Sequence, residues 1–262
     1  VESVEQTATG VTAVLANGER VTGRWLVGAD GARSAVREAL EIPFEGFTWP
    51  EAFLVVSTPF PFERHMDGLC WVNYFADPDE WFFLLRAPDF WRVMFPTGQD
   101  EPEAEIFDAA KIQRRLQRVL PQPAPYEVAH TTLYRVHQRV ATRYRSGRAF
   151  LAGDAAHINN PLGGMGMNGG IHDAFNLGGK LAAIMGADAD PALLNAYEAE
   201  RRPVALEYVN EITIRNKRNL ETRDPAEQAA FRQTLDAALA DPAKRRAFLL
   251  RASMLASLGV GG

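Results

Sequence analysis

Residues 153–170 carry the sequence GDAAHINNPLGGMGMNGG, which includes the densest glycine cluster of the chain. Five of the eight residues from 163 to 170 are glycine. Backbone N–H groups of such a segment can approach a ligand closely because glycine has no Cβ. Apolar residues then recur at helical spacing from Gly170 to Met185, which predicts an amphipathic helix. Since a helix N-terminus stabilises negative charge, the segment is a candidate anion site.

Two aspartates follow short apolar strands elsewhere in the sequence. The strand expected at Ala149–Ala152 leads directly to Asp154. A second expected strand, Trp25–Val27, runs into a loop that contains Asp30, and a short helix follows. In an open α/β sheet, ligands bind beyond the carboxyl ends of the strands. Both aspartates are therefore candidate ligand contacts, and helix capping or a turn role is the alternative for each.

The sequence between these two motifs has a different character. Aromatic, strand-like runs recur from Trp49 to Pro96 with short turns between them, which is typical of an antiparallel sheet. Alternation places Asn73 and Tyr74 on opposite faces of one strand, and Arg92 lies in another. These three residues are candidate substrate contacts, with plain structural packing as the alternative. The other expected elements are a helix over about 103–120, a strand over 131–136 and helices over 191–221 and 225–257.

Composition excludes several classes of protein. The 262 residues carry a net charge of −5 and a sequence pI near 5.6, which argues against nucleic-acid binding. The single cysteine, Cys70, excludes an intrachain disulfide framework, and the histidines lack metal-ligand spacing, so we expect no metal. No run of about 18 apolar residues and no signal peptide is recognisable, so we expect a cytoplasmic protein without a membrane span.

The N-terminal residues form an expected β-hairpin with its turn at Asn17-Gly18. The chain starts with Val1 inside this hairpin rather than with Met. We therefore expect the sequence to be part of a longer protein.

Taken together, these motifs resemble the FAD-dependent monooxygenases of the aromatic-hydroxylase type, which have the p-hydroxybenzoate hydroxylase fold. The sequence LVGADGARSAVR at 26–37 matches that family's DG motif, and 153–168 matches its GD motif and flavin loop. DAFNL at 173–177 and ERRP at 200–203 match two further family helices. The family's adenosine-binding strand–GxGxxG–helix segment is not found in these 262 residues, and the glycines from Gly163 to Gly166 lie in the wrong context to replace it. The resemblance therefore covers the chain but not the ADP half of an FAD site.

The resemblance implies an α/β fold. It consists of part of an FAD-binding, Rossmann-like domain, an inserted antiparallel β-sheet substrate domain and a helical C-terminal segment. The expected domain ranges are 1–45 for the DG part, 46–135 for the substrate domain, 136–190 for the GD motif and flavin loop, and 191–262 for the C-terminal helices.

The resemblance also assigns roles to individual residues. Asp154 would bind the ribityl chain of FAD, and Asp30 and Gly31 would lie near the pyrophosphate in a motif also linked to NAD(P)H. Pro161 would lie beside the isoalloxazine near its reactive C4a edge, which makes it the expected catalytic-site residue. The backbone N–H groups of Met167 and Asn168 would face flavin N1 and O2. The remaining expected cofactor contacts are Gly153, Gly163, Gly164 and Gly166.

The implied reaction is hydroxylation of a small aromatic substrate with NAD(P)H and O2, through a C4a-hydroperoxyflavin. The implied partners are the small-molecule substrate and O2, and a homodimer is left open. One alternative is a related flavoenzyme such as an epoxidase, halogenase or reductase, although the halogenase motif WxWxIP is missing from this sequence. The other alternative is a truncated, non-catalytic chain that cannot hold FAD.

Overall fold

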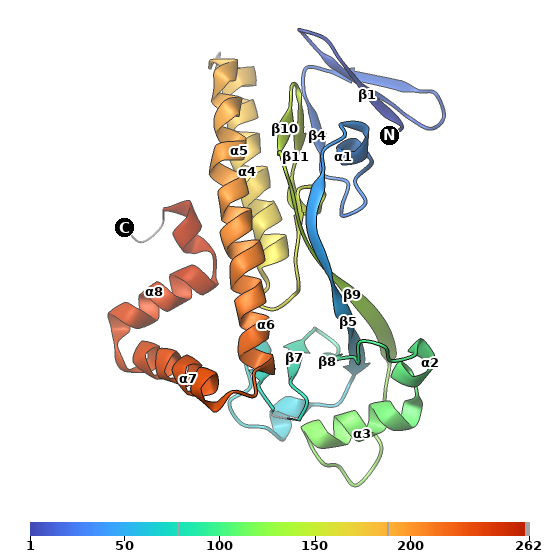
Figure 1. Ribbon diagram of the computed structural model, residues 1–262, viewed down its shortest axis with the longest axis vertical. Coiled ribbons are helices and arrows are strands. Elements are labelled where there is room, and N and C mark those ends of the chain that lie inside the picture. Colours follow the sequence, from blue (N-terminus) through green and yellow to red (C-terminus); the bar gives the residue numbers. More distant parts are fainter. Residues whose placement is uncertain (78, 188, 260–262) are drawn as a thin grey trace. The chain divides into compact units, whose positions relative to one another are not determined.

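The computed structural model describes residues 1–77, 79–187 and 189–259 (Figure 1). The chain divides into two compact units. Unit 1 comprises residues 1–47, 137–216 and 232–262, and unit 2 comprises residues 48–136 and 217–231. No helix in the described ranges is long and apolar enough to cross a membrane. The mixed α/β composition agrees with the expected fold class.

Unit 1 contains two small sheets. The first is antiparallel and consists of β1 (Ser3–Gln6), β2 (Val11–Val14) and β3 (Arg20–Gly23), with the expected Asn17-Gly18 turn between β2 and β3. The second has the order β10 (Arg145–Ser146), β11 (Ala149–Leu151) and β4 (Leu26–Gly28). β11 and β4 are parallel, with Leu151 opposite Gly28. The two aspartate-bearing turns therefore leave the same edge of this sheet.

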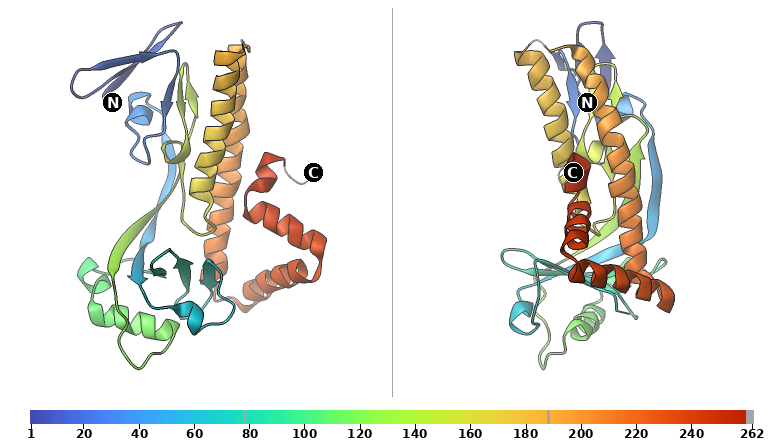
Figure 2. Two further views of the ribbon diagram at one scale, coloured as in Figure 1. Left: turned by 180° about the vertical axis from the view of Figure 1, so that it is seen from behind. Right: turned by 90° about the vertical axis from the view of Figure 1, so that its left-hand side faces the viewer.

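The helices of unit 1 cover its second sheet. α4 and α5 lie side by side (Figures 1 and 2), and Lys180 of α4 donates to Glu200 of α5 at 2.6 Å. A π-helical segment follows Pro203, which lacks the N–H needed for regular helical bonding. The elements of the unit's helical part are α1 (Ala35–Ala39), α4 (Met165–Gly186), α5 (Asn195–Val204), the π-helical Ala205–Ile212, the start of α6 (Thr213–Glu221), α8 (Pro242–Ala252) and 3₁₀ turns at Gly153–Ala155, Pro191–Leu194 and Leu255–Leu258.

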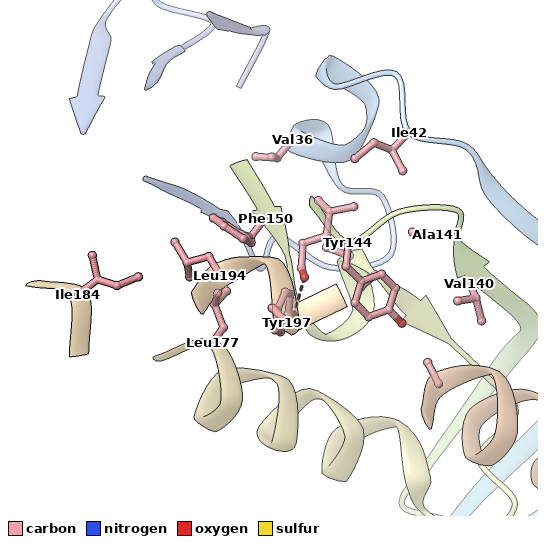
Figure 3. Close-up of a cluster of buried hydrophobic side chains, with 14 residues drawn as sticks. Val36, Ile42, Val140, Ala141, Tyr144, Phe150, Leu177, Ile184, Leu194 and Tyr197 are labelled. Carbon is pink, nitrogen blue, oxygen red and sulfur yellow. Dashed lines mark hydrogen bonds between the residues drawn. The ribbon is translucent and has the colours of Figure 1, made fainter. Parts of the chain in front are cut away.

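The core of unit 1 forms where α4 and α5 pack on β11. Tyr144, Phe150 and Tyr197 are fully buried there together with aliphatic side chains from α1 and α4 (Figure 3). The Tyr197 hydroxyl donates to the carbonyl of Leu151 at 2.7 Å, the bond drawn dashed in Figure 3. This bond fixes α5 at the end of β11, directly before the turn that carries Asp154.

Unit 2 is built on an antiparallel sheet. From Thr48 on, β5 (Phe44–Thr58) lies between β9 (His130–Ala141) and β8 (Trp91–Pro96), and β7 (Phe82–Arg86) and β6 (Val72–Phe75) follow. Leu84 and Val93 from one face pack with Leu116 of α3 (Ala109–Val119). The further elements of the unit are the 3₁₀ turn Phe62–Arg64, α2 (Glu103–Ile106) and the start of α7 (Pro225–Ala240).

Three expected elements have different bounds in the structure. The helix expected over 103–120 breaks into α2 and α3, because Asp108 accepts a hydrogen bond from the Lys111 N–H at 2.8 Å and starts a new helix. The helix expected over 225–257 breaks in the same way at Asp241, which accepts from the Ala243 N–H. The strand expected over 131–136 extends to Ala141, where His157–Ile158 (β12) pairs with its end.

Candidate functional site

The turn between β4 and α1 contains Asp30. Ser34 caps α1 by accepting from the Arg37 N–H at 2.9 Å. Asp30 in turn accepts from the Ser34 hydroxyl at 2.5 Å and from the Val36 N–H at 3.1 Å. Burial alone would raise the pKa of Asp30, but these hydrogen bonds outweigh burial and lower it. Asp30 is thus an ionised carboxylate that stabilises the turn. A turn role was the alternative to ligand contact in the sequence analysis.

The turn after β11 contains Asp154. Its first residue, Gly153, has a φ of +60°, and the Ala152 N–H donates to the Gly28 carbonyl at 3.0 Å. The Asp154 side chain is exposed and forms no hydrogen bond or ion pair within the described part of the chain. A carboxylate in this position is free to accept hydrogen bonds from the hydroxyl groups of a ligand.

Arg37 connects the two turns, a role that the sequence did not reveal. Its guanidinium donates to the Ala155 carbonyl and to the Ala32 carbonyl, each at 3.0 Å, and lies 4.0 Å from the ring centre of Phe44. The side chain is 6% exposed, so the charge is largely buried. Its match to the DG motif was the only available signal, because Ala155 lies 118 residues away.

The glycine cluster differs from the sequence prediction in one respect. The helix starts at Met165 rather than Gly170, because Gly164 adopts a φ of +64° and serves as its N-cap. A Cβ on Gly170 would lie 3.2 Å from the Gly153 Cα, so the absence of side chains lets α4 pack against the Asp154 turn. The last glycines therefore serve close packing rather than loop freedom.

The N-terminus of α4 meets the requirements of an anion site. No side chain caps it, and the N–H groups of the first helical residues have no intrahelical acceptor. Met167 in this first turn is 74% exposed, which leaves the backbone around it accessible. Asn168 donates its side-chain amide to the Gly164 carbonyl at 2.8 Å, which stabilises the turn. The Pro161 carbonyl accepts a hydrogen bond from the Gly164 N–H at 3.0 Å, which closes the turn directly before α4.

A buried amide network supports the segment before Pro161. Asn160 is fully buried, and its backbone and side-chain N–H groups both donate to Gln138 Oε1 at 3.2 Å. Its side-chain oxygen accepts from the Leu162 N–H at 3.0 Å. Gln138 in turn donates to the Thr213 hydroxyl at 3.0 Å. The sequence showed two asparagines before Pro161 but gave no sign of this partner, because Gln138 lies in a separate strand.

In unit 2, the sheet places the three candidate substrate contacts on different faces. Asn73 pairs in register with Leu84 on the face packed against α3, and it accepts from the Cys70 N–H and donates to the Cys70 carbonyl, both at 2.7 Å. Tyr74 pairs with Phe83, and Arg92 pairs with Leu85, on the opposite face. This second face, here called the Arg92 face, combines buried apolar and aromatic side chains, such as Phe83 and Met94, with the exposed Arg92.

A model of a known family matches most of the chain. The family is described as FAD binding domain, and the match covers residues 1–211.

Curated relatives agree with this match. The chain is 36% identical over 236 residues to a para-nitrophenol 4-monooxygenase of Pseudomonas sp. (strain WBC-3), covering 88% of this chain and 58% of that protein. It is 38% identical over 208 residues to a 6-hydroxy-3-succinoylpyridine 3-monooxygenase of Pseudomonas putida, covering 79% of this chain and 52% of that one. The chain therefore spans about half the length of these relatives.

Solved structures show the same fold. A p-nitrophenol 4-monooxygenase from Pseudomonas putida DLL-E4 superimposes with a TM-score of 0.84 at 33% identity, over 96% of this chain and 66% of that one. An aklavinone-11 hydroxylase in complex with FAD and aklavinone superimposes with a TM-score of 0.72 at 30% identity, over 84% of this chain and 43% of that one.

Proposed function

Because the chain belongs to the family of FAD-dependent aromatic hydroxylases, we propose that it forms part of a monooxygenase that hydroxylates a small phenolic substrate with NAD(P)H and O2. The observation that carries this proposal is the carboxylate of Asp154, which is exposed and has no partner in the described part of the chain. It lies at the carboxyl edge of the parallel strands β4 and β11, and α4 packs against the same turn.

The residues present in unit 1 fit FAD. The ribityl chain offers hydroxyl groups for which Asp154 is a ready acceptor. The flavin ring is negatively charged when reduced, and the uncapped N-terminus of α4 favours negative charge. We assign the N–H groups of Met167 and Asn168 to the negatively charged part of the flavin ring. Asp30 and Gly31 are assigned to the pyrophosphate region. When bound, FAD supplies electron transfer from NAD(P)H and the activation of O2.

The protein's own residues would orient the cofactor and exclude water. Gly153, Gly163, Gly164 and Gly166 would let the backbone approach the flavin, and Pro161, which follows the buried amide network, would lie beside the ring. These assignments imply no nucleophilic side chain. Neither a homodimer nor a cytoplasmic location is needed for this chemistry, and both remain proposals.

Binding of FAD depends on Asp154 in this proposal. We expect Asp154→Ala to weaken FAD binding by about tenfold or more, because a charge-assisted hydrogen bond is lost. The measurement is flavin fluorescence on titration, supported by a visible spectrum after gel filtration. Asp236→Ala is the matched control, since Asp236 is also exposed and unpaired in the described part of unit 1. Equal FAD affinity in both variants would show that Asp154 does not contact the cofactor.

The Arg92 face of unit 2 is proposed as the substrate side. The relatives named for para-nitrophenol and pentachlorophenol act on phenols, and a phenolate would be attracted to Arg92. Tyr74 and the aromatic side chain of Phe83, whose ring centre is 5.5 Å from that of Tyr74, suit an aromatic ring. The Asn73 side chain closes the Cys70 turn through two hydrogen bonds. Its position next to Tyr74 in sequence is therefore the remaining reason to propose it as a substrate contact.

Arg92 provides a test of this substrate assignment. We expect Arg92→Met to raise KM for a phenolate substrate by about tenfold with a smaller change in kcat, because the arginine attracts the substrate's charge from an exposed position. Arg114→Met is the control, because Arg114 is exposed on α3 across the sheet and its replacement removes the same charge. If both variants change KM equally, the effect comes from net charge and the assignment of Arg92 fails.

A further inference from the structure

Asp173 of α4 is a carboxylate with no exposed surface and three hydrogen-bond donors. One of its oxygens, Oδ2, accepts from the Gly153 N–H at 3.1 Å and from His157 Nε2 at 2.8 Å. The other oxygen, Oδ1, accepts from Arg201 Nε at 2.8 Å. The donors come from the Asp154 turn, from β12 and from α5, so one side chain joins four elements of unit 1.

The surroundings of Asp173 keep it ionised. Burial alone would raise its pKa, but the hydrogen bonds and charges of His157 and Arg201 outweigh burial and lower the pKa. Arg201 is 3% exposed and provides the compensating positive charge. His157 Nδ1 is buried without a hydrogen-bond partner among the residues that the structure describes. Removal of the Asp173 charge would leave Arg201 as a buried cation without its counter-charge, and removal of Arg201 would do the same to Asp173.

The bond to Gly153 gives this cluster a specific consequence. Gly153 has a φ of +60° and directly precedes Asp154. The Gly153 N–H donates to Asp173. The Gly153 carbonyl accepts from the Ala156 N–H, and the Ala155 carbonyl accepts from Arg37. The direction of the Asp154 side chain therefore depends on where α4 holds the Asp173 carboxylate.

We propose that Asp173 is a positioning residue, which sets the geometry of the Gly153–Asp154 turn and thereby aims the Asp154 carboxylate at the ribityl chain. Arg201 and His157 act through Asp173 by fixing its two oxygens. The identity of the ligand rests on the proposed function, whereas the control of the turn by Asp173 does not.

Tyr197 offers a matched control for this proposal. It lies one helical turn from Arg201 on α5, is fully buried and donates a single hydrogen bond to the Leu151 carbonyl. Tyr197→Phe removes a buried hydrogen bond of the same unit but none of the three hydrogen bonds that Asp173 accepts. A general loss of stability can therefore be separated from a change in the turn.

The experiment compares wild type, Asp173→Asn, the double variant Asp173→Asn/Arg201→Gln and Tyr197→Phe as full chains. Hydrogen exchange at the Gly153 amide is measured by NMR, thermal unfolding is recorded for each variant, and FAD affinity is measured by fluorescence titration. In the double variant the side-chain carbonyl of the introduced asparagine can still accept the Gly153 N–H. The amide of that asparagine can donate to the introduced glutamine instead of opposing a buried arginine.

We expect Asp173→Asn to speed exchange at Gly153 by about tenfold beyond the change in global stability, and to weaken FAD binding by a similar factor. The double variant should recover most of the slow exchange at Gly153 and most of the FAD affinity. Tyr197→Phe should lower the melting temperature without either effect. The proposal is overturned if, at equal stability, Asp173→Asn and Tyr197→Phe exchange alike at Gly153. Failure of the wild type to take up FAD would count against FAD binding by the residues of this chain and not against the control of the turn by Asp173, because the exchange measurement needs no cofactor.

Discussion

Replacement of Gly46 by alanine is expected to destabilise the folded protein strongly. Gly46 lies in the first part of β5 with a φ of +140°, and an added Cβ would lie 1.9 Å from the Gln138 carbonyl oxygen and 2.8 Å from the Arg139 Cα. Both neighbours are backbone atoms of β9 and cannot move aside as a side chain would. We expect a loss of more than about 3 kcal/mol, a large part of a typical stability of about 5–15 kcal/mol.

Urea unfolding followed by circular dichroism measures this effect, together with the yield of soluble protein. Gly68→Ala is the control, because Gly68 also has a positive φ, of +76°, but nothing lies within 4 Å of an added Cβ. The control should lose only about 1 kcal/mol from backbone strain. Similar unfolding midpoints for the two variants would contradict the close contact between β5 and β9.

Substitution of Gly166 by valine is expected to separate NAD(P)H oxidation from product formation. A Cβ at this position would lie 2.8 Å from Asn159 Oδ1, and Asn159 is held in turn by a 2.6 Å bond to the Asn160 carbonyl. The first turn of α4 would have to shift away from the buried amide network. Because a small displacement of a positioned group has large effects on rate, product per NAD(P)H should fall by about tenfold.

The coupling ratio is measured as hydroxylated product formed per NAD(P)H consumed, with hydrogen peroxide as the competing product. Gly178→Val provides the control, since Gly178 lies on the same helix with open space around it. The control should remain coupled. Full coupling in Gly166→Val would show that the α4 N-terminus and the segment 163–170 do not form the flavin loop.

Local patterns were sufficient for much of the fold. Alternating aromatic runs predicted the antiparallel strands of unit 2, and Asn17-Gly18 predicted the turn between β2 and β3. Apolar strands that end in Asp30 and Asp154 predicted two turns, and the structure places both at one sheet edge through the parallel pairing of β4 with β11. These features succeed because each depends on neighbours within one strand, turn or helix.

Element boundaries were harder to predict, because capping competes with periodicity. The apolar spacing over 103–120 is continuous, but the Asp108 side chain starts a second helix within it. The glycines at 163–170 suggested a loop up to Gly170, yet α4 starts at Met165 and uses Gly169 and Gly170 for packing. In both cases the sequence pattern predicted a helix, and contacts of individual residues decided where the helix begins.

The sequence alone determined the α/β class, the two aspartate turns, the presence of a helix at the glycine cluster and the family, since these rest on residue types at fixed local spacing. Only the tertiary structure showed that Arg37 joins the two turns and that Asp173 pairs with Arg201 and the Gly153 N–H. The partners are 118, 28 and 20 residues apart. Burial makes each of these polar groups require a partner, but the path of the chain decides which residue provides it.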